Sequence, residues 1–411
     1  MVTHKTQPYI VLASSTGAFT VCFMIWMIFS VLGLPIKESL GLNATQFGLL
    51  TAMPVLSGSL CRIPLGMMTD RYSARAVFAV LMLICIPPLL LMPYATQYYH
   101  FLLISLWLGL IGGSFSVGTP YVARWFPKER QGLAMGIFGA GNAGAALNKL
   151  MAPTLIGLFG WTFVPNSYAV ILLITVILFW IFSYPTPKAT QKRTVSLQDQ
   201  LRLMKNKDVL KYSQYYSVVF GGYVGLSLWM VSYYVDEYGF SLASAALLAA
   251  CFSLPGGVLR AFGGWLSDKY GAYKVTWAVM WVCWVAFFIM SYPQTAMIIE
   301  TVNGPFSLNI GLNAFFFTLL IFIVGIALAI GKASVFKFIA DDFPDEIGTV
   351  SGIVGLAGGL GGFLLPILFG ALVDITGIRS SSFMLMYGAV SISLIWMHFN
   401  FKQRRSTHRS N

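Results

Sequence analysis

The sequence has few charged residues and no carboxylate in the middle of its long apolar segments. Asp, Glu, Lys and Arg make up 10% of the 411 residues, whereas hydrophobic residues make up 57%. Soluble globular domains carry about 25% charged residues, so the composition excludes that class. Repeated apolar runs of membrane-spanning length indicate a polytopic protein embedded in the lipid bilayer.

Cysteine and histidine are also scarce, with five and four residues respectively. The cysteines fall in apolar segments without metal-ligand spacing, which predicts small buried side chains and neither a metal site nor disulfides. No Ser-His-Asp, Cys-His or HExxH arrangement can be assembled at membrane depth. We therefore expect no bound cofactor and no enzyme, and a membrane enzyme is kept only as an alternative.

Twelve apolar segments predict an all-α membrane protein with twelve transmembrane helices in two pseudo-symmetric six-helix bundles. The expected domains are an N-terminal bundle at 1–187, a basic cytoplasmic linker at 188–211 and a C-terminal bundle at 212–411. The predicted helices lie at 9–34, 44–68, 76–93, 97–122, 131–159, 163–184, 212–235, 243–267, 273–291, 312–340, 346–372 and 382–401.

The basic residues indicate how the chain crosses the membrane. If the N-terminus is cytoplasmic, Lys37 and Arg379 are the basic residues on outer loops, and the others outside the helices lie on the inner side. The positive-inside rule therefore predicts a multi-pass protein of the cytoplasmic (inner) membrane with both termini cytoplasmic. The net charge of +12 follows from this orientation. Because these charges are scattered over several loops, we expect no binding to nucleic acid.

One pattern of glycine, arginine and an acid-base pair occurs in both halves, with Arg260 following Arg62 by 198 positions. An arginine within the hydrocarbon core costs several kcal/mol unless it faces a partner or a cavity. The repetition predicts that the two halves jointly enclose an anion. The first copy comprises Gly58, Arg62, Gly66, Asp70 and Arg71, and the second comprises Gly256, Arg260, Gly264, Asp268 and Lys269.

Four cations lie near the middle of predicted helices, namely Arg62, Lys149, Arg260 and Lys332. They cannot neutralise one another, and the carboxylates lie near helix ends or on loops. For each lysine, snorkelling toward an interface or hydrogen bonding to backbone carbonyls is an alternative explanation. A guanidinium presents a planar fork of donors that matches a planar oxyanion, so the arginines predict an anion site at the midplane.

Glycine is concentrated in the fifth and eleventh predicted helices, in the segments GIFGAGNAGAA at 136–146 and GIVGLAGGLGGFLLP at 352–366. Small residues at helical spacing allow helices to approach and slide against each other in lipid. Plain helix packing is the alternative to a gating role. The glycines expected at such contacts are Gly139, Gly141, Gly144, Gly355, Gly358 and Gly359.

These two segments resemble the twin signatures of the nitrate/nitrite porter family, whose bacterial members are the NarK-type carriers of the major facilitator superfamily. The pairs Asp70 with Arg71 and Asp268 with Lys269 resemble the signature loop of that superfamily, from which Ser73 and Ala74 depart. The resemblance implies two bundles that rock about a central site and open it alternately to each side. It also implies a gating role for the acid-base pairs.

The family resemblance also assigns the substrate site. It implies that Arg62 and Arg260 bind the anion, that Phe115 and Phe220 cover its flat faces, and that Tyr216 and Asn142 donate hydrogen bonds. The expected substrate is nitrate or nitrite, carried by a monomer that serves nitrate assimilation. An organic or phosphate anion carrier and a nitrate sensor that does not transport are kept as alternatives.

The coupling ion is expected to be a proton. Segments LNKLMAP at 147–153 and IGKASVFKF at 330–338 resemble the proton-symport branch of the family, which implies proton-coupled nitrate uptake. Burial among cations favours a neutral amine, so an arriving anion would draw a proton to Lys149 or Lys332. Nitrate/nitrite antiport is the main alternative.

Overall fold

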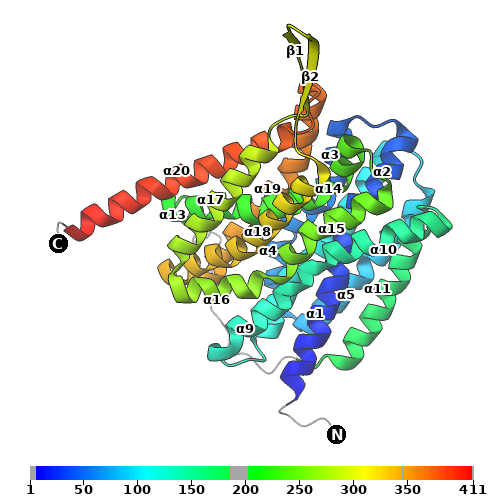
Figure 1. The fold of residues 1–411 in the computed structure, drawn as a ribbon. Coiled ribbons are helices and arrows are strands. Elements are labelled where there is room, and N and C mark those ends of the chain that lie inside the picture. The colour runs from blue at the N-terminus through cyan, green and yellow to red at the C-terminus, as the bar shows by residue number, and fades with distance from the viewer. Residues whose placement is uncertain (1–5, 186–201, 345, 410–411) are drawn as a thin grey trace.

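The computed structural model describes residues 6–185, 202–344 and 346–409. Figure 1 shows helices packed side by side in one body, with a β-hairpin projecting from one end. We call this the hairpin end; the chain begins at the opposite end. All twelve predicted segments are helical in their described residues, as expected for the all-α class.

The N-terminal half contains helices that are interrupted at short breaks. At one break, between the first two helices, the carbonyl of Met27 accepts from the backbone N–H of Ser30 at 3.0 Å and from Asn148 Nδ2 at 2.8 Å. The elements are α1 (Gln7–Trp26), α2 (Phe29–Leu40), α3 (Ala44–Leu60), α4 (Arg62–Arg71), α5 (Ala74–Ile84), α6 (Ile86–Leu91), η1 (Met92–Tyr94), α7 (Tyr98–Leu108), η2 (Gly109–Gly113), α8 (Ser114–Ala123), α9 (Lys128–Gly139), η3 (Ala140–Ala143), α10 (Gly144–Phe159) and α11 (Phe163–Phe182).

The C-terminal half repeats this arrangement and adds the hairpin. Its first span runs from Lys207 to Tyr238, so residues 207–211 of the predicted linker are helical, while 188–201 lie outside the described residues. The elements are α13 (Lys207–Tyr216), the π-helical turn η4 (Ser217–Gly221), α14 (Gly222–Tyr238), α15 (Leu242–Val258), α16 (Arg260–Tyr270), α17 (Ala272–Met290), β1 (Thr295–Thr301), β2 (Gly304–Ile310), α18 (Ala314–Asp342), α19 (Ile347–Thr376) and α20 (Ser381–Arg409).

The length and hydropathy of the helices agree with those of a membrane protein. Within the described ranges, ten helical runs are long and apolar enough to cross a bilayer, or eleven if α15 and α16, bent by 48°, form one span. The run α9, η3 and α10 occupies the fifth predicted segment. The five cysteines are free as expected, but Cys61 and Cys251 are partly exposed, so the expectation of burial was wrong for these two.

The β-hairpin was not predicted. Strand β1 pairs antiparallel with β2 from Thr295 opposite Ile310 to Thr301 opposite Gly304. Gly304 has a φ of 105°, which favours glycine, and Asn303 before it gives the Asn-Gly pair typical of tight hairpin turns. The Asn-Gly pair was the feature of the sequence from which the hairpin could have been predicted.

Polar contacts join the two halves at the hairpin end. Lys37 Nζ lies 3.1 Å from Asp236 Oδ2. The carboxylate of Asp374, near the end of α19, accepts hydrogen bonds from the backbone N–H groups of Ala44 at 3.1 Å and Thr45 at 2.8 Å. A carboxylate at a helix N-terminus also interacts favourably with the helix dipole, so Asp374 helps to hold α3 against α19.

Candidate functional site

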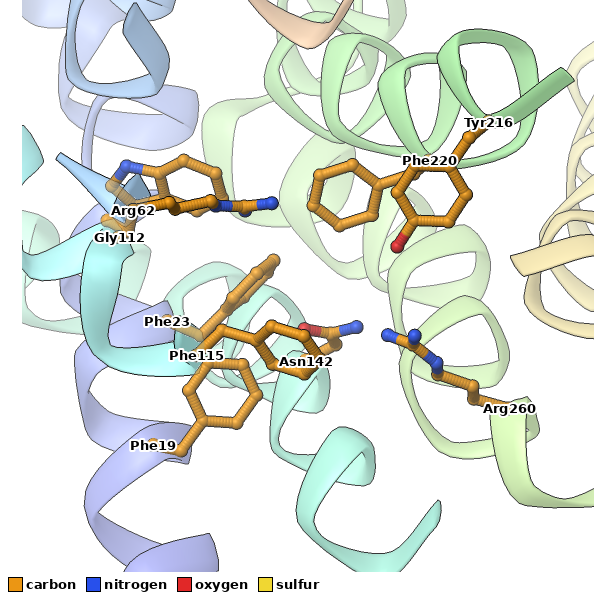
Figure 2. Close-up of a pocket in the computed structure, with 10 residues that line it drawn as sticks. Phe19, Phe23, Arg62, Gly112, Phe115, Asn142, Tyr216, Phe220 and Arg260 are labelled. Carbon is orange, nitrogen blue, oxygen red and sulfur yellow. The ribbon is translucent and has the colours of Figure 1, made fainter. Parts of the chain in front are cut away.

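One small cavity in the middle of the structure receives an arginine from each half. Figure 2 shows both guanidinium groups pointing into it from opposite sides. All six residues predicted to bind substrate belong to its lining. The lining residues are Phe19, Phe23, Trp26, Arg62, Gly112, Phe115, Asn142, Tyr216, Phe220 and Arg260.

Arg62 is the first residue of α4, directly after the break that separates it from α3. Its Nη1 donates to the carbonyl of Gly355 on α19 at 3.2 Å, so this side chain bridges the two halves. The guanidinium carbon lies 5.2 Å from the ring centroid of Phe220. The buried Nε has no hydrogen-bond partner among the described residues and is available to a ligand.

Arg260 occupies the equivalent position in the C-terminal half, as the first residue of α16 after the bend at Leu259. Its guanidinium carbon lies 5.3 Å from the centroids of both Phe115 and Phe336. Phe115 and Phe220 were predicted to cover the faces of a flat anion. Each ring lies beside an arginine, where the ring quadrupole attracts the cation, and the stacking of these rings on an anion stays a prediction.

The aromatic lining comes largely from equivalent helices of the two halves. Phe19, Phe23 and Trp26 on α1 have the spacing of Tyr216, Phe220 and Tyr223, which follow 197 positions later. The rings of Tyr216 and Phe220 stack with centroids 5.2 Å apart, and the hydroxyl of Tyr216 points into the cavity (Figure 2). Sequence reasoning missed the α1 residues and Phe336, although the repeated spacing was a usable signal for the α1 residues.

Asn142 supplies an unpaired donor. It lies in the 3-10 turn η3 between α9 and α10 and is only 1% exposed. Its Nδ2 has no partner among the described residues and faces the cavity (Figure 2). Leaving a buried donor unpaired costs about 1–3 kcal/mol, so this geometry favours a ligand with acceptor atoms.

The predicted glycines pack closely against the lining. A Cβ at Gly141 would lie 2.4 Å from the ring of Phe19, and a Cβ at Gly358 would lie 2.4 Å from the ring of Tyr216. Glycine is therefore required where each ring crosses the neighbouring helix. The other four approach Arg260 (Gly139), the backbone of Thr20 (Gly144), Arg62 (Gly355) and Ser59 (Gly359).

Lys149 and Lys332 are buried outside the cavity lining, with exposed fractions of 1% and 0%. The snorkelling alternative is therefore wrong for both. Lys149 Nζ donates to Ser253 Oγ at 2.8 Å, and Lys332 Nζ donates to the carbonyl of Gly256 at 2.6 Å. Lys149 Nζ also donates to the carbonyl of Ala145 at 3.4 Å, so both lysines hydrogen-bond to a backbone carbonyl, as the second alternative expected.

The acid-base pairs lie in the last turns of α4 and α16, the helices that begin with Arg62 and Arg260. The Asp268 carboxylate pairs with Lys337 of the same half at 3.5 Å, and Lys337 also contacts Asp341 at 2.9 Å. Lys269 lies over the rings of Trp265 and Tyr270. Arg71 is exposed, and the side chain of Asp70 lies outside the described residues. Their gating role stays a prediction.

Comparison with known proteins gives three findings. The family described as Major Facilitator Superfamily matches residues 15–315. The "Probable nitrate/nitrite antiporter NarK1" of Thermus thermophilus is 38% identical over 98% of this chain and 94% of its own length, and the "Nitrite extrusion protein" of Bacillus subtilis (strain 168) is 29% identical over 95% and 94%. A crystal structure of a bacterial homolog to the human lysosomal transporter Spinster has a TM-score of 0.70 over 97% of each chain at 16% identity, which shows a shared fold.

Proposed function

Because the chain belongs to the nitrate/nitrite porter family of the major facilitator superfamily, we propose that it carries nitrate or nitrite across a membrane by alternating access. Members of this superfamily are transporters, in agreement with the expectation that the chain is not an enzyme. The names of the two relatives mention nitrate or nitrite, which supports this substrate class.

The observation that carries the proposal is the convergence of Arg62 and Arg260 on one cavity that no carboxylate lines. Arg62 Nε and Asn142 Nδ2 are unpaired donors there. A flat oxyanion offers acceptor oxygens to several donors at once. Aromatic walls exclude water and lower the local dielectric, which strengthens each charge-assisted hydrogen bond.

The lining favours a small anion over an organic or phosphate ester. Besides the two arginines, the polar side chains of the lining are Asn142, the hydroxyl of Tyr216 and the indole of Trp26. Trp26 Nε1 already donates to the carbonyl of Pro54 at 2.8 Å. Few groups therefore remain to bind the hydroxyl groups of a sugar or glycerol moiety.

For the coupling, we propose proton-driven nitrate uptake with Lys149 and Lys332 as proton carriers. Both amines are buried and donate to α15, the helix that precedes Arg260, and the cavity lining contains no carboxylate to carry a proton. An entering anion stabilises a nearby charged lysine, so anion and proton would bind together. Exchange of nitrate for nitrite is the second candidate, which the name of the Thermus thermophilus relative favours.

In the cell, we propose a monomer in the cytoplasmic membrane with both termini in the cytoplasm. The distribution of basic residues supports this orientation. The hairpin end, with the contacts of Lys37 with Asp236 and of Asp374 with the start of α3, would then face outward.

Reconstitution of the purified protein into liposomes with a pH dye inside tests the proposal. Entry of nitrate together with acidification of the lumen supports proton symport. Entry that requires nitrite or nitrate inside, without acidification, supports exchange. Binding of nitrate without any flux would indicate a sensor. Phosphate-ester transport without nitrate transport would overturn the proposed substrate.

A further inference from the structure

Tyr223 lies beside the cavity without belonging to its lining, and it contacts several buried polar groups. Its ring packs on Gly256, where a Cβ would come within 2.4 Å of the ring, and Lys332 Nζ lies 3.6 Å from the ring centroid. Its hydroxyl lies 2.9 Å from the carbonyl oxygen of Ser253 and 3.3 Å from that of Asn142. The single hydroxyl proton is therefore shared between acceptors on two different helices.

These acceptors belong to different halves of the protein. Asn142 lies in η3 of the N-terminal half, whereas Tyr223 and Ser253 lie on α14 and α15 of the C-terminal half. The hydrogen bond from Lys149 to Ser253 joins the halves a second time. All four residues are buried, so the contacts are shielded from water.

The equivalent residue of the N-terminal half makes no such connection. Trp26 corresponds to Tyr223 by the repeated aromatic spacing, and its Nε1 donates to the carbonyl of Pro54 within its own half. An indole N–H donates only once, whereas a hydroxyl can donate to either acceptor and also accept. The bond between Tyr223 and Asn142 thus breaks the symmetry of the two halves beside the anion site.

We propose that Tyr223 is a positioning residue that links anion binding at Asn142 to closure of the hairpin end. This inference rests on the proposed function. Asn142 presents its unpaired Nδ2 to the cavity and its carbonyl oxygen to Tyr223. An anion that fixes Asn142 therefore also fixes the acceptor that Tyr223 needs to bridge the halves.

Opening of the hairpin end would separate these partners. The chain direction places Tyr223 between Phe220 in the cavity and Tyr238, which bonds the carbonyl of Leu312 at the hairpin end. Separation of the halves there breaks the bonds from Tyr223 to Asn142 and from Lys149 to Ser253. Without a bound anion, Asn142 is less firmly held and this separation becomes easier.

Tyr223→Phe tests the proposal because it keeps the ring over Gly256 and Lys332 and removes the hydroxyl. Nitrate exchange is measured in proteoliposomes, and spin labels at Glu38 and Ile375, exposed in opposite halves at the hairpin end, report closure in a cysteine-free background. We expect the KM for nitrate to rise roughly two- to tenfold, with a similar loss of the nitrate-induced closed population and little change in maximal exchange rate.

Tyr234→Phe is the matched control. Tyr234 is buried on the same helix, and its hydroxyl bonds Thr318 of the same half at 2.7 Å. This variant should leave the KM and the label distances unchanged. A wild-type KM and wild-type label distances in Tyr223→Phe, or equal effects in both variants, would overturn the role of Tyr223.

Failure of the proposed function gives a different result. Wild-type protein that neither imports nor exchanges nitrate would overturn that function. Label distances measured without an anion then still decide whether the Tyr223 hydroxyl stabilises the closed hairpin end, and identical distances in wild type and Tyr223→Phe would refute it.

Discussion

Arg62 and Arg260 illustrate how a single residue type sets the chemistry of the site. Each begins a helix after a break, and each lies against an aromatic ring of the opposite half, Phe220 or Phe115. Both side chains line the cavity, and the ring lowers the cost of holding a cation there without a carboxylate. An anion between them would be shared by both halves.

Conservative replacement of either arginine tests the importance of the planar fork. Arg62→Lys and Arg260→Lys keep the charge but lose bidentate hydrogen bonding, so we expect the KM for nitrate to rise by about tenfold or more. Nitrate exchange in proteoliposomes measures this. Arg202→Lys, the same change at an exposed arginine outside the cavity lining, is the control. Near-normal KM values in both Arg62→Lys and Arg260→Lys would refute the shared site.

Replacement of the lysines separates coupling from binding. Lys149→Met and Lys332→Met remove buried charges that lie outside the cavity lining. We expect several-fold slower proton-driven uptake in each variant, while nitrate exchange stays measurable. If both variants acidified the lumen as much per nitrate taken up as the wild type does, the lysines would be excluded as proton carriers.

At the scale of elements, the glycine-rich helices determine how closely the lining rings approach. Gly141 lies under Phe19, and Gly358 lies under Tyr216 with the same 2.4 Å clearance for an added Cβ. The same contact between a ring and a glycine-rich helix therefore occurs once in each pair of equivalent helices, at Phe19 with Gly141 and at Tyr216 with Gly358.

Gly358→Ala should therefore displace Tyr216 and reduce nitrate exchange strongly, because the ring cannot move without disturbing its stack on Phe220. Gly352→Ala on the same helix is the control, since no atom lies within 4 Å of its added Cβ. Comparable exchange rates and thermal stability in the two variants would contradict the packing role of Gly358.

The sequence predicted the helices well because hydropathy and membrane thickness determine where spans lie. The six residues that the duplicated arginine and the family resemblance assigned to the substrate also line one cavity, and their binding of substrate stays a prediction. The sequence did not predict the bend before Arg260 or the contact of Tyr223 with Asn142. These features depend on the distance between helices remote in sequence, which spacing along one helix does not reveal.

At the scale of the whole molecule, the halves meet at the hairpin end through Asp374 at the N-terminus of α3 and through Lys37 with Asp236. Alternating access requires these contacts to break and reform during each cycle. Their strength therefore affects how often this end is closed.

Asp374→Asn should shift the protein toward an open hairpin end, because a neutral amide interacts less with the helix N-terminus than a carboxylate does. Longer distances between labels at Glu38 and at Ile378 of the opposite half would show the shift. Glu300→Gln, on the exposed hairpin of the same end, is the control. Unchanged distances in Asp374→Asn would show that this carboxylate does not stabilise closure.

The central claim is that Arg62 and Arg260 bind one anion together. Titration of the purified protein with nitrate in a calorimeter measures this directly. The account predicts one nitrate per chain in the wild type, weaker binding in Arg62→Lys and in Arg260→Lys, and the weakest binding in the double variant. Two nitrate ions per chain, or wild-type affinity in either single variant, would contradict the account.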